Sequence, residues 1–267
     1  MKNRYHLSVE NISVDYYFGN DFLDSINGDH CHDKYEISYL VSGSGSYNVE
    51  GSEHKITRGT VMLINPMSYH KVDLECKDDI ELYTVCFDKD VLSPAVKALI
   101  DKVTESSDGR GSIFPPRLVC DELSGSFERF CVAKKLNEAE SEAYINALLT
   151  EIVILLSAAE GERIISSGEE LGARVVAYLN QNIEKKIGLD KLARRFFVSK
   201  YYLCRAFKNY SGISLHAYVN QKRIMYAHQL IKSGVTASEA AEKVGFGDYS
   251  AFYRAYVKIL GKSPTAE

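Results

Sequence analysis

An internal repeat in the last hundred residues constrains the fold of this chain more than any other feature of its sequence. The segment 192–208 aligns with the segment 240–256 at an offset of 48 residues, which becomes 49 after one extra turn residue. A repeat of this period indicates that one supersecondary unit is built twice. The aligned pairs are Ala193 with Ala241, Val198 with Phe246, Ser199 with Asp248, Leu203 with Phe252, Arg205 with Arg254, Ala206 with Ala255, Phe207 with Tyr256, Gly212 with Gly261 and Ser214 with Ser263.

Each copy contains the parts of a helix-turn-helix motif. A short first helix carries a small alanine, an apolar residue fills the turn, and a second helix begins at a strong N-cap and ends at a glycine. The N-caps are Ser199 and Asp248, and the terminal glycines are Gly212 and Gly261. We therefore predict that residues 168–267 form an all-helical domain with two helix-turn-helix motifs.

The residues predicted on the outer face of each second helix are polar or aromatic. They share one side of the helix because they recur three and four positions apart. The major groove of DNA admits one such helix, whose first turns meet the base edges. An ordinary helical domain with solvated charges is the competing interpretation, but repeat, caps and charge together argue against it. The predicted DNA-contacting residues are Lys200, Tyr201, Cys204, Arg205 and Lys208 on the first helix and Tyr249, Ser250, Tyr253 and Arg254 on the second.

The charge distribution favours a polyanionic partner for the C-terminal part alone. The whole chain has a net charge of −4, but residues 168–267 contain 16 Lys and Arg against 8 Asp and Glu, a net charge of +8. Residues 1–167 therefore carry a net charge of −12. A basic domain on an acidic body is typical of a protein that binds nucleic acid through one domain.

The C-terminal sequence resembles the AraC/XylS family of bacterial transcription regulators. The matching stretches are 192–212 and 240–264, and the segment 223–227 between them resembles the linker helix of the family. The resemblance implies two recognition helices that enter successive major grooves on one face of double-stranded DNA. One departure concerns the last helical turn. The family usually continues past its Ser-Pro pair with an aromatic and a basic residue, whereas the segment 265–267 here reads Thr-Ala-Glu.

The N-terminal part is predicted to be a β-sandwich or small barrel followed by helices. Short runs rich in β-branched and aromatic residues alternate with glycine-containing turns up to about residue 88. Beyond them the apolar pattern takes a helical period, interrupted by a loop at 105–116, and helices are predicted at 121–136 and 138–159. The apolar stripe on the last helix is interpreted either as core or as a dimer interface. The fold class is therefore α+β.

A cluster of candidate ligand residues lies among the predicted strands. His30, His32, Glu36 and Gly43 fit the spacing HxHx3Ex6G, and His70 follows further along the chain. This pattern resembles the cupin barrel, whose metal-binding members use two histidines, a glutamate and a distant third histidine. Such a set suits a divalent transition metal. Many AraC-type regulators carry a cupin-like sensor with a similar pattern and no metal, so no metal is favoured and no cofactor is predicted.

The cupin resemblance implies an effector pocket inside the barrel. Strand tyrosines could stack there on a sugar ring, although each of them could equally be half-buried strand filler. The chain contains no Trp, which weakens the sugar interpretation. The predicted pocket residues are His30, His32, Glu36, Tyr39, Tyr47 and His70.

These features together predict a ligand-responsive DNA-binding regulator that is not an enzyme. We expect a cupin-like effector-binding and dimerisation domain at 1–160, a linker at 161–167 and a double helix-turn-helix domain at 168–267. Its expected partners are double-stranded DNA, a small-molecule effector with a sugar as the candidate, a second copy of the chain, and RNA polymerase. Two alternatives stay open: a metal-dependent cupin enzyme or metal sensor fused to a DNA-binding domain, and a regulator controlled by a protein partner.

Cysteine spacing and hydropathy predict a cytoplasmic protein without a membrane partner. No two of the six cysteines have CxxC spacing, and a chain of 267 residues does not depend on a disulfide framework. The first 18 residues lack the apolar core of a signal peptide. The most apolar run, 152–159, is too short to span a bilayer.

Overall fold

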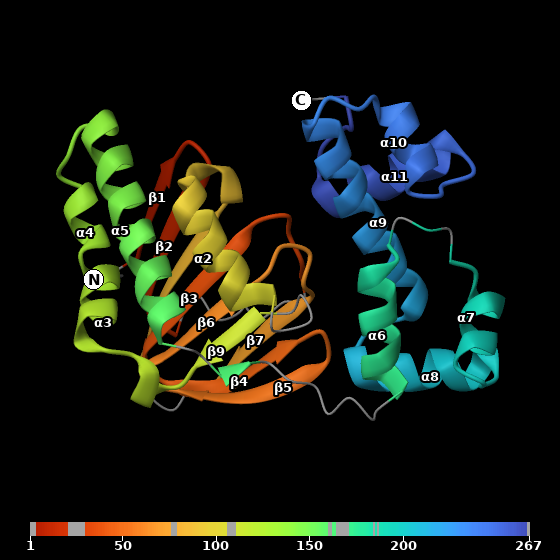
Figure 1. The fold of residues 1–267 in the computed structure, drawn as a ribbon, viewed down its shortest axis with the longest axis horizontal. Helices are drawn as coiled ribbons and strands as arrows, with labels where there is room; N and C mark the ends of the chain where they lie inside the picture. Colours follow the sequence, from red (N-terminus) through yellow and green to blue (C-terminus); the bar gives the residue numbers. More distant parts are fainter. Residues whose placement is uncertain are drawn as a thin grey trace. The chain divides into compact units, whose positions relative to one another are not determined.

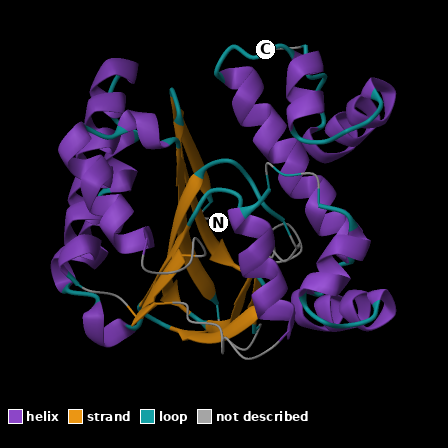
Figure 2. Cartoon of the chain, turned by 45° about the vertical axis from the view of Figure 1, so that its right-hand side comes forward, coloured by secondary structure: helices purple, strands orange, loops and turns teal. Residues whose placement is uncertain are grey.

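The computed structural model divides the chain into two compact units, Met1–Ile165 and Ser166–Glu267 (Figure 1). Strands and helices make up the first unit, and the described residues of the second contain helices and loops (Figure 2). The structure describes residues 4–20, 30–75, 79–105, 111–159, 162–163, 171–183, 185 and 187–265.

Two antiparallel sheets form the framework of the first unit. The larger sheet contains β1 (Tyr5–Val9), β2 (Ile12–Gly19), β3 (Tyr35–Ser42), β6 (Thr60–Ile64), β8 (Ile80–Phe87), β9 (Gly111–Phe114) and β10 (Glu162–Arg163). The smaller sheet contains β4 (Ser44–Val49), β5 (Ser52–Thr57) and β7 (His70–Leu74). The strand orders are β1-β2-β8-β3-β6-β9-β10 and β5-β4-β7. Both sheets agree with the predicted sandwich or barrel of short strands.

Strand β3 divides its side chains between two cores, because successive residues of a strand point to opposite faces of the sheet. Ile37 and Tyr39 face the helices that cover the larger sheet. Leu40 belongs to the apolar cluster between the two sheets, and Glu36 and Ser38 line a cavity on that same side. The pairing Ser38–Thr84 with β8 continues this division across the sheet.

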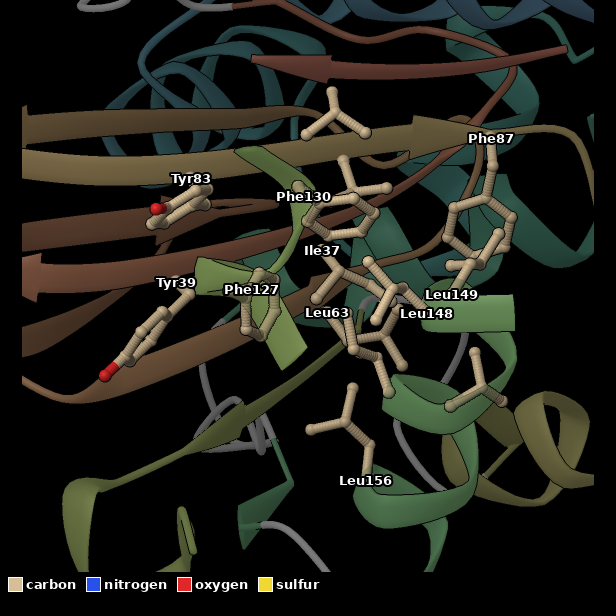
Figure 3. Close-up of a cluster of buried hydrophobic side chains, with 14 of the residues drawn as sticks. Ile37, Tyr39, Leu63, Tyr83, Phe87, Phe127, Phe130, Leu148, Leu149 and Leu156 are labelled. Carbon is tan, nitrogen blue, oxygen red and sulfur yellow. The ribbon is translucent and has the colours of Figure 1, made fainter. Parts of the chain in front are cut away.

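Helices cover the outer face of the larger sheet (Figure 1). Figure 3 shows Phe127 and Phe130 packed with Ile37 and Leu63 of the strands, and the ring centroids of Tyr39 and Phe127 are 5.0 Å apart. This layer completes a large apolar core. Its elements are the 3-10 helices η1 (Lys89–Val91) and η2 (Pro116–Leu118) and the α-helices α2 (Pro94–Glu105), α3 (Asp121–Glu128), α4 (Phe130–Ala133) and α5 (Glu138–Ala158).

The apolar stripe of α5 is part of this core. Leu148, Leu149 and Leu156 are buried against the sheet (Figure 3), whereas Ile154 is 45% exposed. Among the described helices, α5 is the one whose length and composition would suffice to cross a membrane. It is longer than the apolar run singled out in the sequence, and its packing here is that of a core helix.

Two short strands correct the sequence expectations. The predicted loop at 105–116 contains β9, which pairs with β6, and the predicted linker at 161–167 contains β10, which pairs with β9. Backbone pairing at a sheet edge recruits these residues, and composition does not reveal it. The other linker residues lie outside the described residues.

The second unit contains the two predicted helix-turn-helix motifs, and its helix ends confirm the predicted caps. The Ser199 side chain accepts a hydrogen bond from the Tyr202 amide, and Asp248 accepts hydrogen bonds from two amides of its helix. Gly212 and Gly261 end these helices at φ values of 78° and 70°. The helices are α6 (Leu171–Gln181), α7 (Leu189–Arg195), α8 (Lys200–Ser211), α9 (Leu215–Lys232), α10 (Ala237–Lys243) and α11 (Tyr249–Leu260).

A glycine allows α6 to approach α8 closely. A Cβ atom built on Gly172 would lie 2.2 Å from Cβ of Tyr210. We predict that Gly172→Ala forces the two helices apart and lowers the free energy of unfolding by about 1–3 kcal/mol, as overpacking typically does. Urea denaturation followed by circular dichroism measures this change.

Gly125→Ala in α3 is the matched control, since a Cβ atom added there would meet no described atom within 4 Å beyond its chain neighbours and the backbone of its own helix. It should be neutral or raise stability by up to about 1 kcal/mol, because alanine is the better helix former. Equal stability of the Gly172→Ala variant and the wild type would contradict the close packing of α6 on α8.

Candidate DNA-binding surface and internal cavity

The inner faces of α8 and α11 fix which side chains point outward. Leu203 and Phe207 of α8 are fully buried, as are Phe252 and Tyr256 of α11. Because a helix turns through 3.6 residues, anchoring this stripe exposes the opposite side of each helix. The predicted DNA-contacting residues that are exposed are Lys200, Tyr201, Arg205, Lys208, Tyr249, Ser250, Tyr253 and Arg254.

Arg205 and Arg254 occupy equivalent positions, six residues after the N-caps of their helices. Within the part of the chain that the structure describes, neither guanidinium makes an ion pair or a hydrogen bond, and both side chains are exposed. An exposed guanidinium presents a fork of donors that matches phosphate oxygens or the edge of a guanine. These two side chains are therefore available to a nucleic acid.

Two of the predicted contact residues are engaged within the protein instead. The Lys200 ammonium lies 2.6 Å from the carboxylate of Asp190 on α7, and this hydrogen bond lowers the pKa of Asp190. Cys204 is only partly exposed and lines an apolar cavity of about 190 Å³ together with Leu215 and Val219 of α9. The expectation of a freely exposed Cys204 is therefore corrected: it lies where α8 meets α9.

The structure also shows two exposed aromatic residues near α8 that the sequence prediction omitted. Phe197 is 95% exposed and Tyr202 is 56% exposed. Phe197 has a φ of 56° and aligns with Gly245, whose φ is 81°, at the turn of the second motif. The repeat alignment itself could have revealed that a bulky residue occupies a glycine-type position there.

A cavity of about 240 Å³ lies between the two sheets of the N-terminal unit. Both sheets contribute to its walls, because Glu36 and Ser38 of β3 lie across from Tyr47 of β4 and His70 of β7. Polar groups gather along the larger sheet and apolar ones lie among them. The lining residues are Asp15, Tyr17, His30, His32, Glu36, Ser38, Tyr47, Met62, His70, Val72, Leu82, Thr84 and Cys86.

The structure places five of the six predicted pocket residues on this cavity and corrects the sixth. Tyr39 does not line it; its ring lies against Phe127 on the opposite face of the larger sheet. The reason is the two-residue period of a strand, since Tyr39 is one position away from Ser38 and three from Glu36. The same alternation would have predicted Ser38, which the sequence interpretation missed.

The buried carboxylate of Glu36 is the centre of the polar cluster in this cavity. Its Oε2 atom lies 3.0 Å from Nε2 of His32 and 3.3 Å from Nε2 of His70. Its Oε1 atom accepts a hydrogen bond of 2.9 Å from the Ser38 hydroxyl. The ring of His30 lies beside that of His70 at a tilt of 58°, with centroids 4.2 Å apart.

Charge in this cluster is determined by competition between burial and neighbours. Burial by itself raises the pKa of Glu36, but the imidazoles of His70 and His32 outweigh it and hold that pKa well below its usual value. Burial lowers the pKa of His70, and the Glu36 carboxylate outweighs that effect and raises it. The two neighbouring imidazoles therefore favour the ionised form of the Glu36 carboxyl group.

Both units match models of known protein families. Residues 11–153, more than half of the chain, match the AraC-like ligand-binding domain, and residues 192–266 match a helix-turn-helix domain. The first match contains every lining residue of the cavity, and the second contains α8 and α11.

The chain is also similar to transcription regulators over most of its length. The thermoregulatory protein LcrF of Yersinia pestis is 24% identical over 245 residues, covering 88% of this chain and 89% of LcrF. The uncharacterized HTH-type transcriptional regulator YbfI of Bacillus subtilis is 23% identical over 224 residues, covering 83% of this chain and 79% of YbfI. The crystal structure of ToxT from Vibrio cholerae is 13% identical and covers 99% of this chain and 95% of that one, with a TM-score of 0.40.

We predict that α8 and α11 make one kind of DNA contact in common and other DNA contacts that differ between the two helices. Arg205 and Arg254 match, whereas Tyr201 faces Ser250 in the alignment, so different half-sites can be read beside a common anchor. Tyr201→Ala and Ser250→Ala are expected to change the preferred bases. If the arginine contacts a base edge, each Arg→Ala substitution should cost about 1–3 kcal/mol of binding free energy and relax the preference at one base. If it contacts a phosphate, the substitution should weaken binding to all sequences alike.

Selection of binding sites from a random duplex library measures these preferences, with Arg58→Ala in the other unit as the control. Arg58 is exposed but lies in the turn between β5 and β6. Unchanged preference at every base in both the Tyr201→Ala and Ser250→Ala variants would contradict the division of contacts.

Proposed function

Because the chain belongs to the AraC family of transcription regulators, we propose that a small polar molecule in the inter-sheet cavity controls its binding to DNA. The protein is a DNA-binding transcription regulator with a cupin-like ligand-binding domain. The finer proposals concern the effector, the oligomeric state and the cellular setting. We place its action in the cytoplasm and assign the cavity to sensing, not to catalysis.

The observation that carries the DNA-binding proposal is the pair of equivalent arginines on the exposed faces of two helices, neither of which has a partner among the described residues. Arg205 and Arg254 stand on helices whose caps and buried faces are alike, so each copy presents a guanidinium at the same position of its helix. The net charge of +8 on residues 168–267 adds a favourable field for a polyanion. We therefore assign the DNA contacts to this unit.

A sugar is the candidate effector, because the cavity offers both hydrogen-bonding groups and aromatic faces. Asp15, Ser38 and Thr84 supply oxygen atoms on one wall, and the rings of Tyr17 and Tyr47 also line the space. A volume of about 240 Å³ suits a molecule of monosaccharide size better than a large ligand. Specificity for hydroxyl groups would follow from polar side chains that are otherwise buried.

We propose that the DNA-bound form is a homodimer. We also propose that the regulator contacts RNA polymerase when it activates transcription. The outer side of the helix layer is the candidate dimer surface, because Val132 and Ile154 are exposed there at 38% and 45%. The remaining stripe of α5 is buried in the core and is not available to a second chain. Run-off transcription with purified polymerase tests the activating contact.

We predict that the full chain binds duplex DNA with a slope of log affinity against log salt steeper than about −3, since each neutralised phosphate contributes about −0.9. Arg205→Ala or Arg254→Ala should reduce the magnitude of the slope by about 1 when the arginine contacts phosphate. Titration of a labelled duplex by fluorescence anisotropy measures the slope, and its stoichiometry gives the number of chains bound.

Arg58→Ala is the control for these titrations and should leave the slope unchanged. An affinity that stays flat between low and high salt would contradict DNA binding through the basic unit. A stoichiometry of one chain per duplex at saturation would contradict the proposed dimer but not the proposed DNA binding.

The effector proposal predicts that a monosaccharide raises the thermal stability of the N-terminal unit. At a concentration of about 100 times its dissociation constant, a ligand adds about 2.7 kcal/mol by mass action. Thr84→Val removes a hydroxyl from the cavity wall and should reduce the shift, whereas Tyr39→Phe removes a hydroxyl outside the cavity and should not. A panel of monosaccharides that leaves the melting temperature unchanged would rule out a sugar of that size.

A further inference from the structure

We propose that Phe197 is a specificity-determining residue that packs its phenyl ring on the 5-methyl group of a thymine in the major groove of DNA. Phe197 lies in the turn of the first helix-turn-helix motif, two residues before Ser199, the N-cap of α8. The inference rests on the proposed DNA binding through this unit and deepens it, because it adds an apolar contact to the contacts proposed above.

The backbone conformation of Phe197 is one that a residue with a Cβ atom adopts only with strain. Its φ is 56°, in the left-handed region, where the Cβ atom crowds the carbonyl oxygen that follows it. The equivalent residue of the second motif is Gly245, which has a φ of 81° and no Cβ atom. A glycine would therefore form the turn of the first motif without this crowding.

The turn does not depend on the phenyl ring, since the same backbone hydrogen bonds form it in both motifs. The amides of Phe197 and Gly245 donate to the carbonyl oxygens three residues earlier, at 3.2 and 2.9 Å. The amides of the residues that follow them donate to the carbonyl oxygens five residues earlier, at 3.1 and 3.0 Å. The motif with a phenylalanine and the motif with a glycine thus have the same turn.

The packing of the free protein does not explain the ring either. Phe197 is 95% exposed, so its side chain gains almost no hydrophobic stabilisation from folding. The preceding residue, Phe196, instead packs edge-on against the ring of Tyr178, with centroids 6.0 Å apart. A strained residue whose side chain folding does not bury indicates a function outside the core.

The position of Phe197 on the motif points to DNA as its partner. The first turns of a recognition helix meet the base edges, so a residue just before the N-cap is carried toward the same groove. Tyr201, in the first turn of α8, is exposed beside it in the sequence, and the exposed Arg194 and Arg195 end α7 on the other side of the turn. Positive charge around the ring favours a phosphate backbone nearby.

The thymine methyl group is the apolar feature that a phenyl ring can recognise in the major groove. The other groups that distinguish the base edges there are hydrogen-bond donors and acceptors, and a phenyl ring offers neither. Burial of one methyl group against the ring supports about a fourfold gain in affinity. Because Gly245 has no side chain, the second motif lacks this contact, and the resulting preference for thymine is confined to the half-site that α8 reads.

The test compares the full chain with its Phe197→Gly variant on the duplex that the wild type selects from a random library. The variant should keep or raise the melting temperature, because its turn then has the residue type of the second motif. Fluorescence anisotropy should show binding to this duplex weakened at least about fourfold. Replacing single thymines by deoxyuracil removes only the 5-methyl group. It should weaken wild-type binding about fourfold at one position and leave binding by the variant unchanged there.

Phe18→Ala is the matched control, because Phe18 is an exposed phenylalanine of β2 in the other unit. This variant should bind the selected duplex like the wild type. It should also lose the same factor in affinity as the wild type when the thymine methyl group is removed.

Several results would overturn the contact. These are equal affinity of the wild type and Phe197→Gly for the selected duplex, no loss of wild-type affinity on removal of any thymine methyl group, and a methyl effect of the same size in both proteins. A melting temperature of Phe197→Gly well below that of the wild type would show that the ring stabilises the fold, and would overturn its assignment to a partner.

Two further outcomes separate this contact from the proposed function. Weaker run-off transcription by Phe197→Gly at unchanged affinity for DNA would assign the residue to a protein partner and overturn the thymine contact. Steep salt dependence of wild-type binding alongside any of these results would leave the proposed function intact, whereas no binding of DNA by the wild type would overturn both.

Discussion

The alternation of side chains along β3 is the constraint on which the N-terminal unit depends. Ile37 and Tyr39 require an apolar cover, and the helices α2 to α5 supply it. Glu36 and Ser38 point the other way, so the space between the sheets receives polar groups in a buried place. A buried carboxylate is tolerated only when cationic or hydrogen-bonding partners surround it. The strand therefore specifies both the core and the need for partners in the cavity.

The same logic of opposite faces organises the C-terminal unit. The inner residues of α8 and α11 are alike in size and position, because both motifs bury a similar stripe. The outer residues are released from packing and are free to differ, as at Tyr201 and Ser250. Under the proposed division of contacts, this release lets the two helices read different half-sites, while the common arginine position preserves one mode of attachment.

The sequence predicted those features that depend on local periodicity or on capping. Ser199, Asp248 and the two terminal glycines could be located because caps have a strict residue preference. Tyr39 was placed on the wrong face, although counting by twos from Glu36 would have placed it correctly. The inward position of Cys204 depends on α9, a helix more than ten residues away, so no local pattern reveals it.

Tertiary pairing explains the rest of what the sequence could not show. Strands β9 and β10 exist because an open sheet edge accepts their backbone groups, and their residues have no strong strand pattern of their own. The convergence of His32, Glu36 and His70 is similar: the motif supplied the residue types, but only the fold brings His70 of the smaller sheet to the carboxylate.

The position of β3 between the cavity and the helix layer determines how an effector in the cavity would act on this protein. A ligand shifts a conformational equilibrium only by the difference between its free energies of binding to the two states. A molecule in the cavity would touch the Glu36 and Ser38 side of the strand, while Tyr39 on the other side packs on Phe127 of α3. Any differential contact made in the cavity therefore acts on the strand that also carries the helix layer, and interiors packed this closely transmit such strain.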